Sequence, residues 1–558
     1  QHGLATSAYK WHPIDKPLGS NDPSDLGMGS TNVEELFSPM AVLDNYVSVS
    51  EQQRIRARAG LTWQPVKGLT AKTELSLSRN WKESKSWDAG KQSGYSVATL
   101  SNSNGYGVRW ATTLNYEVQG LGEDHSLNIL AGNEVLASNS NSSSITGAGY
   151  PIEFTMGDAF GMINMTDPSL GKDKFSAEVG TPNRTLSWFG RVNYGYKGKY
   201  LLTATFRADG SSKFAPNNRW GYFPAAAAAW RISDEEFMEN TRDWLDNLKL
   251  RVSYGTSGSD NISASLWQST WETSTITVDG VVTPVYVPGA MKPNPDLMWE
   301  TTTSRNIGVD FSMWNGRLRG SVDGYWNSTD DNLMRLPVDA SSGYSYQYQN
   351  VAKTSNKGVE LALGADLVRS KDFNLSINAT YSYNISNIDE ISEDALADTS
   401  TGWGSTMRLP KYDYVIRKDH PIGLIQGFVA DGFYKVSDFD VVNGQWVLKA
   451  GVPDVDIINY TNPGFNLPEG QNAFPGVQKF KDIKKDGRVN GDDAAYVGET
   501  LPKHTGGFSL SGNWKNLDFS AAFTYQIGGD VYNATAAHTM AGSKDTAFGQ
   551  NRLGYIAG

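Results

Sequence analysis

Long stretches of this chain alternate strictly between apolar and polar residues. In Gly68 to Ser78, leucine, alanine and threonine occupy one parity, and the other parity is mainly lysine, glutamate and serine. Similar alternation runs through Ile55 to Trp63, Leu248 to Tyr254 and Phe373 to Tyr381. Because successive side chains of a strand point to opposite faces, this period predicts strands with one apolar and one polar face. We count about fourteen such segments by this rule, each roughly 9 to 13 residues long, and therefore expect an all-β fold.

The connections between these segments alternate in length. Short links are expected at Gln64 to Gly68, Gln119 to Asp124, Gly198, Asn315 to Gly316, Val368 to Asp372 and Lys515 to Asn516. Long links are expected at Arg79 to Arg109, Ala137 to Thr185, Ala208 to Gly221, Thr256 to Thr303, Asn327 to Asn356 and Asn384 to Thr505. A link of moderate length, Ser233 to Asp246, could hold a short helix. Short turns at one end and long loops at the other are typical of an up-and-down antiparallel transmembrane β-barrel.

A soluble sandwich, propeller or solenoid also alternates, and three observations count against it. No sequence unit recurs at a fixed period. The segments match the roughly 9 to 11 residues with which a tilted strand crosses a bilayer. Aromatic residues gather near the segment ends, where an interfacial girdle would lie. These residues are Trp63, Trp188, Tyr200, Trp314, Trp326 and Trp514.

Composition excludes several classes of protein. The net charge of −11 and the absence of a basic block argue against a nucleic-acid partner. With no cysteine, the chain has no disulfides and no thiolate metal sites. Its longest apolar run, Ala225 to Trp230, is far shorter than the roughly 20 residues of a membrane-spanning helix. Neither end of the chain carries a leader or a closing element, so we expect it to be part of a longer protein.

Several motifs, in order along roughly residues 50 to 535, resemble the SusC-like (SusC/RagA) family of TonB-dependent outer-membrane transporters. The most specific are the stretch from Arg207 to Phe214 (RADGSSKF), Asn218 to Pro224 (NRWGYFP), Trp230 to Ser233 (WRIS), and Asn294 to Glu300 (NPDLMWE) leading into Asn306 to Phe311 (NIGVDF). Further matches are Leu248 to Gly258, Asn356 to Glu360 (NKGVE) and Gly427 to Phe433 (GFVADGF).

The resemblance implies a 22-stranded barrel in the outer membrane of a Gram-negative bacterium, closed by an N-terminal plug. It also implies nutrient import driven by the TonB complex, with a SusD-like surface lipoprotein as a lid. The matching motifs correspond to the middle and later part of such a barrel, so we expect the plug, the TonB-contacting segment and the terminal strands to lie outside these residues. We therefore expect residues 1–558 to be a partial barrel with long extracellular loops, surrounded by outer-membrane lipid.

A possible Ca²⁺ site lies between Lys481 and Asp493. Acidic residues at loop positions 1, 5 and 12, with glycine at position 6, are typical of a calcium loop. The candidate ligands are Asp482, Asp486, Asn490 and Asp493 through side chains and Arg488 through its carbonyl group. The resembled family commonly has asparagine where this chain has Lys484, which cannot donate an oxygen, and a solvated acidic turn is the alternative. No other cofactor is expected.

The long loops carry aromatic residues whose flat faces could stack on a ligand. They are Trp267, Trp271, Tyr344, Tyr346, Tyr348 and Trp403. Packing within their own loops is the alternative for each of them.

Arg54, Arg56 and Arg58 share the polar parity of one segment and would line the lumen. There they could steer an anionic ligand, or pair with carboxylates of adjacent strands or of the plug.

No catalytic motif is present. The sequence has neither a His-Glu-x-x-His pair, a Gly-x-Ser-x-Gly elbow nor a phosphate-binding loop, so we expect no enzyme. The function expected is active import of a bulky nutrient, with an oligosaccharide slightly favoured over an oligopeptide. A passive structural or adhesive barrel and a soluble glycan-binding protein are the other readings.

Overall fold

A computed structural model describes residues 45–90, 94–151, 153–278, 280–392, 414–457, 462 and 464–533. Most of them belong to one large sheet, in which fourteen strands follow one another as antiparallel neighbours. The strands are β1 (Tyr46–Val66), β2 (Leu69–Asp88), β3 (Val97–Glu117), β4 (His125–Ala148), β6 (Asn183–Tyr196), β7 (Tyr200–Ser211), β8 (Trp220–Arg231), β9 (Leu245–Ser259), β13 (Glu300–Met313), β14 (Leu318–Pro337), β15 (Tyr346–Arg369), β16 (Phe373–Glu390), β26 (Pro502–Trp514) and β27 (Leu517–Gly528). The all-β prediction and the strand count are both confirmed.

Shorter elements occupy the links. They are α3 (Met156–Gly161), η3 (Pro168–Leu170), β5 (Lys174–Val179), η4 (Pro216–Asn218), η5 (Ile232–Asp234), η6 (Glu236–Thr241), β10 (Trp271–Val278), β11 (Val281–Pro288), β12 (Met291–Lys292), η7 (Ala340–Ser342), β17 (Tyr414–Val415), β18 (Leu424–Gly427), β19 (Ala430–Phe433), η9 (Val436–Asp438), β20 (Phe439–Val442), β21 (Gln445–Leu448), β22 (Asp454–Val455), β23 (Gln478–Phe480), β24 (Arg488–Val489), η10 (Gly491–Asp493) and β25 (Ala495–Glu499). No helix among the described residues is long and apolar enough to cross a membrane.

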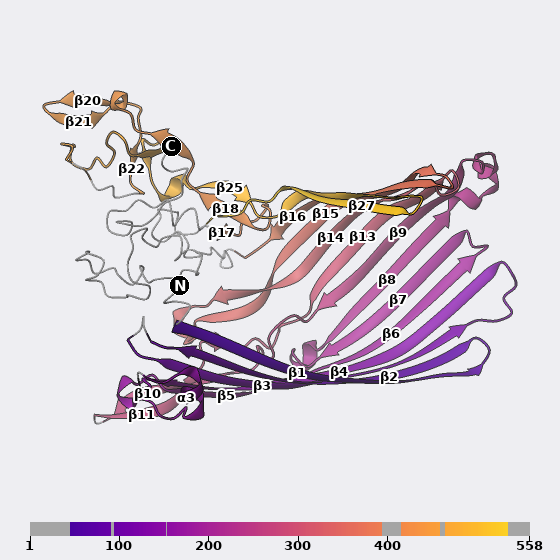
Figure 1. Cartoon of the computed structure of the whole chain (residues 1–558), viewed down its shortest axis with the longest axis horizontal. Coiled ribbons are helices and arrows are strands. Elements are labelled where there is room, and N and C mark those ends of the chain that lie inside the picture. The colour runs from indigo at the N-terminus through magenta and orange to yellow at the C-terminus, as the bar shows by residue number, and fades with distance from the viewer. Residues whose placement is uncertain are drawn as a thin grey trace.

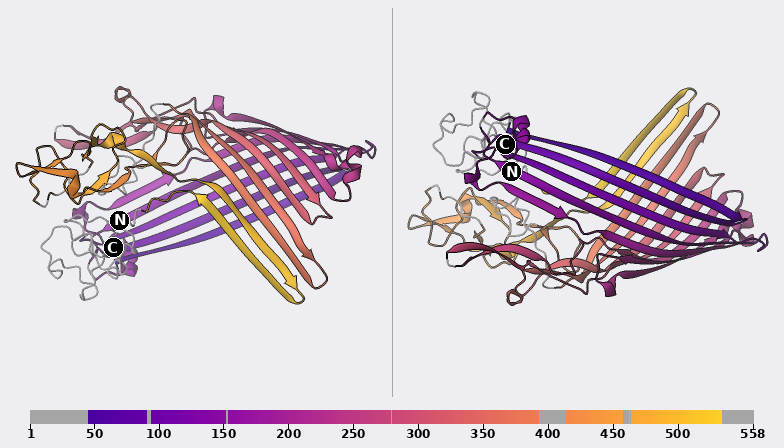
Figure 2. Two further views of the ribbon diagram at one scale, coloured as in Figure 1. Left: turned by 90° about the horizontal axis from the view of Figure 1, so that it is seen from above. Right: turned by 90° about the horizontal axis from the view of Figure 1, so that it is seen from below.

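The sheet curves into an open trough. In Figure 1 it runs from β1 at the lower edge, through β6 to β9, to β27 at the upper edge, and Figure 2 shows the two edges crossing at an angle when viewed from above and below. Short turns join the strands at one end, except for the link of moderate length between β8 and β9, and the longest links lie at the other end. In the described residues β1 and β27 are the two edges of the sheet, and each has a neighbour on one side only.

The register assigns each residue to one of two faces. Across β7, β8 and β9, Phe206, Pro224 and Tyr254 fall on the apolar face with their paired neighbours. On the opposite face of the same strands lie small or polar residues such as Thr205 and Ser253. Helix α3 lies on the convex side of the trough in Figure 1 and packs against the apolar-parity residues Trp87 and Ala98. The polar face therefore lines the inside of the trough.

The predicted strand lengths hold for β7, β8, β26 and β27, which contain 12 or 13 residues, and are too short for the other strands. The strands of the main sheet contain 12 to 24 residues, and β4 and β15 reach 24. Alternation stops at Ala137 in β4, yet the strand continues through Ser138 to Ser144, which is polar on both faces. Because a strand surrounded by water needs no apolar face, the pattern marks only the part that lies in lipid. The expected link Arg79 to Arg109 accordingly shrinks to residues 89–96.

The six girdle candidates are all exposed and lie at two levels. Trp63, Tyr200 and Trp514 lie near the short-turn end of their strands, and Trp314 lies in a short turn. Trp188 and Trp326 lie eight residues from the short-turn ends of β6 and β14, at Tyr196 and Leu318. At about 3.3 Å per residue this is roughly 26 Å along a tilted strand. At a tilt of about 35–45° this distance rises roughly 20 Å across the membrane, which is slightly less than the height of about 25 Å that separates the two interfaces of the apolar band.

The link between β8 and β9 contains two 3₁₀ helices, η5 and η6, where a short helix was expected. Beside them the Glu235 carboxylate accepts hydrogen bonds from Tyr200 Oη (2.6 Å), Trp230 Nε1 (3.0 Å) and Lys199 Nζ (3.2 Å). The hydrogen bonds from Tyr200 and Trp230 lower the pKa of Glu235 from its ordinary value of 4.5 to about 2, with a smaller contribution from Lys199. This carboxylate ties the start of β7 to the end of β8.

We predict that the turn formed by η5 and η6 loosens in acid. Because the folded pKa of Glu235 is depressed, its stabilising contribution is present above about pH 4.5 and is lost as the pH falls toward 2. Hydrogen exchange of residues 232–244 should accelerate over that range in the wild type. In Glu235→Gln it should already be fast at pH 7 and should change less with acid. Equal exchange in both proteins at pH 7 would contradict this.

A buried apolar cluster holds the loop between β9 and β13 against the trough. Phe214, Phe223, Leu266, Met291, Leu297 and Trp299 form it. Phe223 has the inward parity on β8, so the loop packs onto the polar face near its long-loop end. Ser211 supports this by donating a hydrogen bond to Asp260 (2.7 Å).

Leu297→Ala should therefore release this loop. Leu297 has no exposed surface, and emptying such a site costs about 2–5 kcal/mol. We expect faster chymotrypsin cleavage within residues 260–299. The neighbouring Met298, which is 45% exposed, provides the control, because Met298→Ala should leave cleavage unchanged. Similar cleavage of both variants would show that the cluster does not hold the loop.

Candidate functional site

Charged residues on the inner face of β1 to β7 form a chain of ion pairs. Arg58 Nε lies 3.4 Å from Glu74 Oε1, and the Arg109 guanidinium contacts both Glu74 and Glu134. Beyond Glu134 the chain continues to Arg207 (3.5 Å) and from there to Asp209 (2.8 Å). Four of these ion pairs join different strands, and together they run from β1 to β7 on the inner face of a protein whose net charge is −11.

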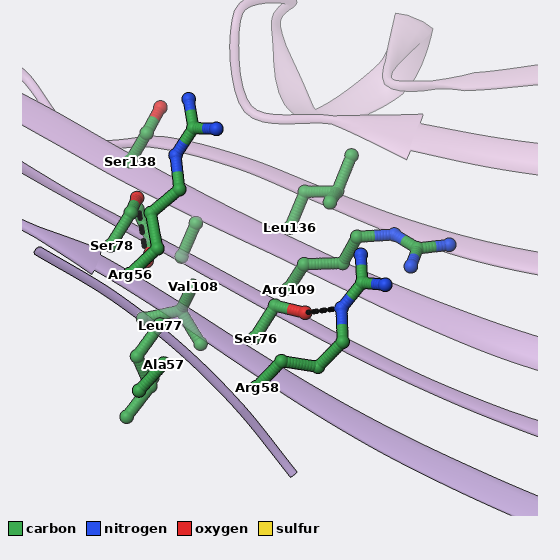
Figure 3. Close-up of a pocket in the computed structure, with 12 residues that line it drawn as sticks. Arg56, Ala57, Arg58, Ser76, Leu77, Ser78, Val108, Arg109, Leu136 and Ser138 are labelled. Atoms are coloured by element: carbon green, nitrogen blue, oxygen red, sulfur yellow. Dashed lines mark hydrogen bonds between the residues drawn. The ribbon is translucent and has the colours of Figure 1, made fainter. Parts of the chain in front are cut away.

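Arg56, Arg58 and Arg109 are among the residues that line a pocket of about 510 Å³, to which residues of both parities contribute. Figure 3 shows the three guanidinium groups on one side of the sheet, and Ala57, Leu77 and Val108 on the other. Serine hydroxyl groups lie between the arginines, and Arg58 Nε donates to one of them, Ser76 Oγ (3.3 Å). Such a surface offers many hydrogen-bond donors and few acceptors.

Arg54, Arg56 and Arg58 were predicted to line the lumen. All three have the inward parity of β1, and Arg58 pairs with a carboxylate of the adjacent strand, as one of the alternatives expected. Within the described residues no ion pair joins Arg54 or Arg56 to a carboxylate. The sequence reading missed Arg109, Glu134 and Arg207, although each is a charge at a polar-parity position of a segment. Only the register between strands places them together.

The opposite wall of the trough is charged but balanced. Arg251 lies 2.8 Å from Asp310 and 3.1 Å from Asp323, and Lys249 also contacts Asp310 at 3.5 Å. On β14 and β15, Arg319 and Arg369 both pair with Asp366. Between the two walls, β7 to β9 present small residues such as Thr205, Ala227 and Ser253.

The predicted ligand-binding aromatics lie in different surroundings. Trp271 begins the hairpin β10–β11 and is 65% exposed, whereas Trp267 and Tyr344 are partly exposed. Tyr346 and Tyr348, expected in a loop, belong to β15 and pack against the cluster around Leu297. Trp403 lies outside the described residues. Ligand contact by these residues stays a prediction, and Trp271 has the most accessible ring of the five that are described.

The loop from Asp482 to Asp493 belongs to a small folded unit between β16 and β26. Tyr434, Phe439, Val455, Ala473, Phe480 and Val489 form its core. The fully buried Asp493 accepts hydrogen bonds from the backbone N–H groups of Ile483 (2.8 Å), Lys484 (2.9 Å) and Asn490 (2.8 Å). This carboxylate fastens both ends of the loop to each other.

The side chains of the other three candidate calcium ligands also accept hydrogen bonds. Asp482 accepts from the backbone of Lys485, Asp486 and Gly487, Asp486 from Arg488, and Asn490 from Asp492. Among the residues that the structure describes, no three His, Cys, Asp or Glu side chains are grouped so as to hold a metal ion. These hydrogen bonds hold the loop without a metal ion. The calcium site stays a prediction.

The hydrogen bonds to the Asp493 carboxylate make the stability of this loop depend on pH, whether or not calcium binds. Burial raises the pKa of Asp493, but the backbone N–H groups of Asn490, Lys484 and Ile483 outweigh it and hold the pKa below its ordinary value. The stabilisation that these hydrogen bonds give to the folded loop is present above about pH 3.9, and it is lost as the pH falls through the lowered pKa of Asp493. Asp493→Asn should therefore speed hydrogen exchange of residues 482–493 at pH 7 without added calcium.

The same exchange measurement, repeated while calcium is added, tests the metal site. Added calcium should slow exchange in the wild type and leave Asp482→Asn unchanged if the site forms. A wild type that does not respond to calcium would remove the site.

Comparison with known proteins identifies the family. Residues 11–555 match the family described as TonB dependent receptor-like, beta-barrel. The chain belongs to this family. It is 31% identical over 452 residues to the TonB-dependent receptor P26 of Formosa agariphila, an alignment that covers 78% of this chain and 40% of P26. It is also 35% identical over 226 residues to the TonB-dependent receptor SusC of Bacteroides thetaiotaomicron, covering 39% of this chain and 22% of SusC.

Solved structures agree on the fold. The RagAB peptide transporter has a TM-score of 0.69 at 22% identity, with 93% of this chain and 52% of the RagAB chain covered. The same importer in its open-open state gives a TM-score of 0.70, also at 22% identity. The prediction of a SusC-like outer-membrane β-barrel is therefore confirmed. The chain spans about half or less of the length of these proteins.

Proposed function

We propose that the full-length protein containing this chain actively imports a bulky nutrient, an oligosaccharide, across the outer membrane. A SusD-like lipoprotein would act as the lid, and the TonB complex would supply the energy. The trough formed by the fourteen strands would be one wall of the conduit. Family membership supports this proposal, since TonB-dependent receptors are the matching family and SusC is among the relatives. No enzymatic step is proposed.

The observation that carries the proposal is the polar inner face, which reaches the long-loop end of the trough. A barrel that serves only as a structural anchor needs no open, hydrophilic interior. Here Thr203, Thr205 and Ser253 give β7 and β9 a smooth hydroxyl-bearing surface, bordered by the ion pairs of β1 to β7. Hydroxyl groups can both donate and accept, as the hydroxyls of a sugar do.

The preference for a sugar rests on the loop aromatics. Trp271 presents an exposed ring on the long-loop side, and a flat ring beside polar groups suits stacking on a pyranose. An oligopeptide is the alternative cargo. RagAB is described as a peptide transporter, but at 22% identity that similarity concerns the fold.

Native mass spectrometry of the full-length protein, purified from outer membranes in mild detergent, tests this proposal. We expect a bound lipoprotein partner and ligand masses spaced by sugar units. A spread of peptide masses would replace the oligosaccharide with an oligopeptide. A barrel that carries neither partner nor ligand, and that lacks a TonB-contacting segment, would support a passive barrel instead.

A further inference from the structure

The inner face of β1 to β7 carries an excess of positive charge. Five rows of paired residues, which begin on β1 at Arg54, Arg56, Arg58, Gly60 and Thr62, define this basic patch. The rows contain six cationic side chains, Arg54, Arg56, Arg58, Lys72, Arg109 and Arg207, and three carboxylates, Glu74, Glu134 and Asp209. The excess lies in a chain that is acidic as a whole.

The three carboxylates are already shared. Glu74 contacts Arg58 and Arg109 at 3.4 Å and Lys72 at 3.5 Å. Glu134 lies between Arg109 and Arg207, and Asp209 is taken by Arg207. Each carboxylate therefore serves between one and three cations, and none is left within the patch for Arg54 or Arg56.

The cations of the patch are accessible from the lumen, and Arg54 and Arg56, which lack carboxylate partners in the described part of the chain, are both exposed. The side chains of Arg58 and Arg109 are 70% and 47% exposed, and with Arg56 they line the pocket of about 510 Å³. Ser76, Ser78 and Ser138 add hydroxyl groups on the same side (Figure 3). A guanidinium presents paired N–H donors that match a carboxylate or sulfate in a bidentate arrangement. The pocket volume lies in the range of small-ligand sites.

The opposite wall shows that this excess is local. Arg251 is held by two carboxylates there, and Asp366 is shared by two arginines. A positive surface along one wall of a passage raises the local concentration of anions beside it. The excess positive charge on the wall formed by β1 to β7 would therefore attract anionic cargo to that side of the passage.

We propose that the basic patch binds anionic groups of the cargo, so that the imported oligosaccharide is an acidic one that carries carboxylate or sulfate substituents. The proposal rests on the proposed import function and deepens it. Arg54 and Arg56 provide the free guanidinium groups, and Arg58 and Arg109 extend the surface toward β3.

A matched pair of probes tests the proposal on the full-length protein in detergent. Oligogalacturonate carries one carboxylate per sugar, and its methyl ester has the same backbone without the charge. We expect the acid to bind about tenfold more tightly than the ester at low salt, as for a charge-assisted contact. Raising the salt concentration should reduce the difference.

Two variants separate the patch from other sources of charge. In Arg54→Gln/Arg56→Gln the preference for the acid should disappear, and both residues lack carboxylate partners among the described residues, so folding should be retained. Arg79→Gln is the control, because Arg79 is on β2 but has the outward parity. It should keep the preference.

Every outcome bears on the proposal. Equal binding of acid and ester, binding of neither, or a preference that survives in the double variant would each overturn it. Co-purified neutral sugars in the mass-spectrometry experiment would overturn the anionic preference while leaving oligosaccharide import in place. Peptide masses would instead overturn the choice of sugar.

Discussion

The absence of water in the hydrocarbon core is the constraint on which this structure depends. Backbone N–H and C=O groups there must be paired within the protein, and strands achieve this only side by side in a closed sheet. The ladder of fourteen antiparallel strands meets the requirement for every interior strand, while β1 and β27 each need a further neighbour. A sheet in this position has lipid on one face and water on the other. The alternation of side chains, the outward aromatic residues and the polar inner face all follow from it.

A polar interior is also what permits the unusual electrostatics of the trough. Arginines in lipid would be costly, but on a water-filled inner face Arg54 and Arg56 can stay charged without partners. The same face places Glu134 between Arg109 and Arg207, which stabilises the register of β3, β4 and β7. Charge therefore has two roles here. The shared carboxylates hold strands together, and the surplus guanidinium groups are available to cargo.

The sequence predicted the parts of the strands that lie in the membrane, and it missed the strand extensions and the small folded unit that lie in water. Alternation identified the fourteen strands and their order of short and long links, because the membrane requires an apolar parity. It ended at Ala137, where β4 leaves the lipid and continues for eleven more residues to Ala148. The folded unit around Tyr434 and Val489 was read as a loop, because short irregular strands have no period to detect. Of the candidate site, Arg54, Arg56 and Arg58 were found by parity, while Glu134 and Arg207 needed the register between strands.

The central claim is that the polar face of the sheet is the inner wall of a water-filled passage. This chain has no cysteine, so single cysteines can be placed along β7, from Leu201 to Ser211, in the full-length protein with any cysteine outside these residues replaced, and tested in intact outer membranes. A membrane-impermeant thiol reagent should label Thr203, Thr205 and Arg207 positions and spare Leu202, Ala204 and Phe206 positions, with a period of two. Uniform labelling, or labelling of the apolar parity, would contradict the account.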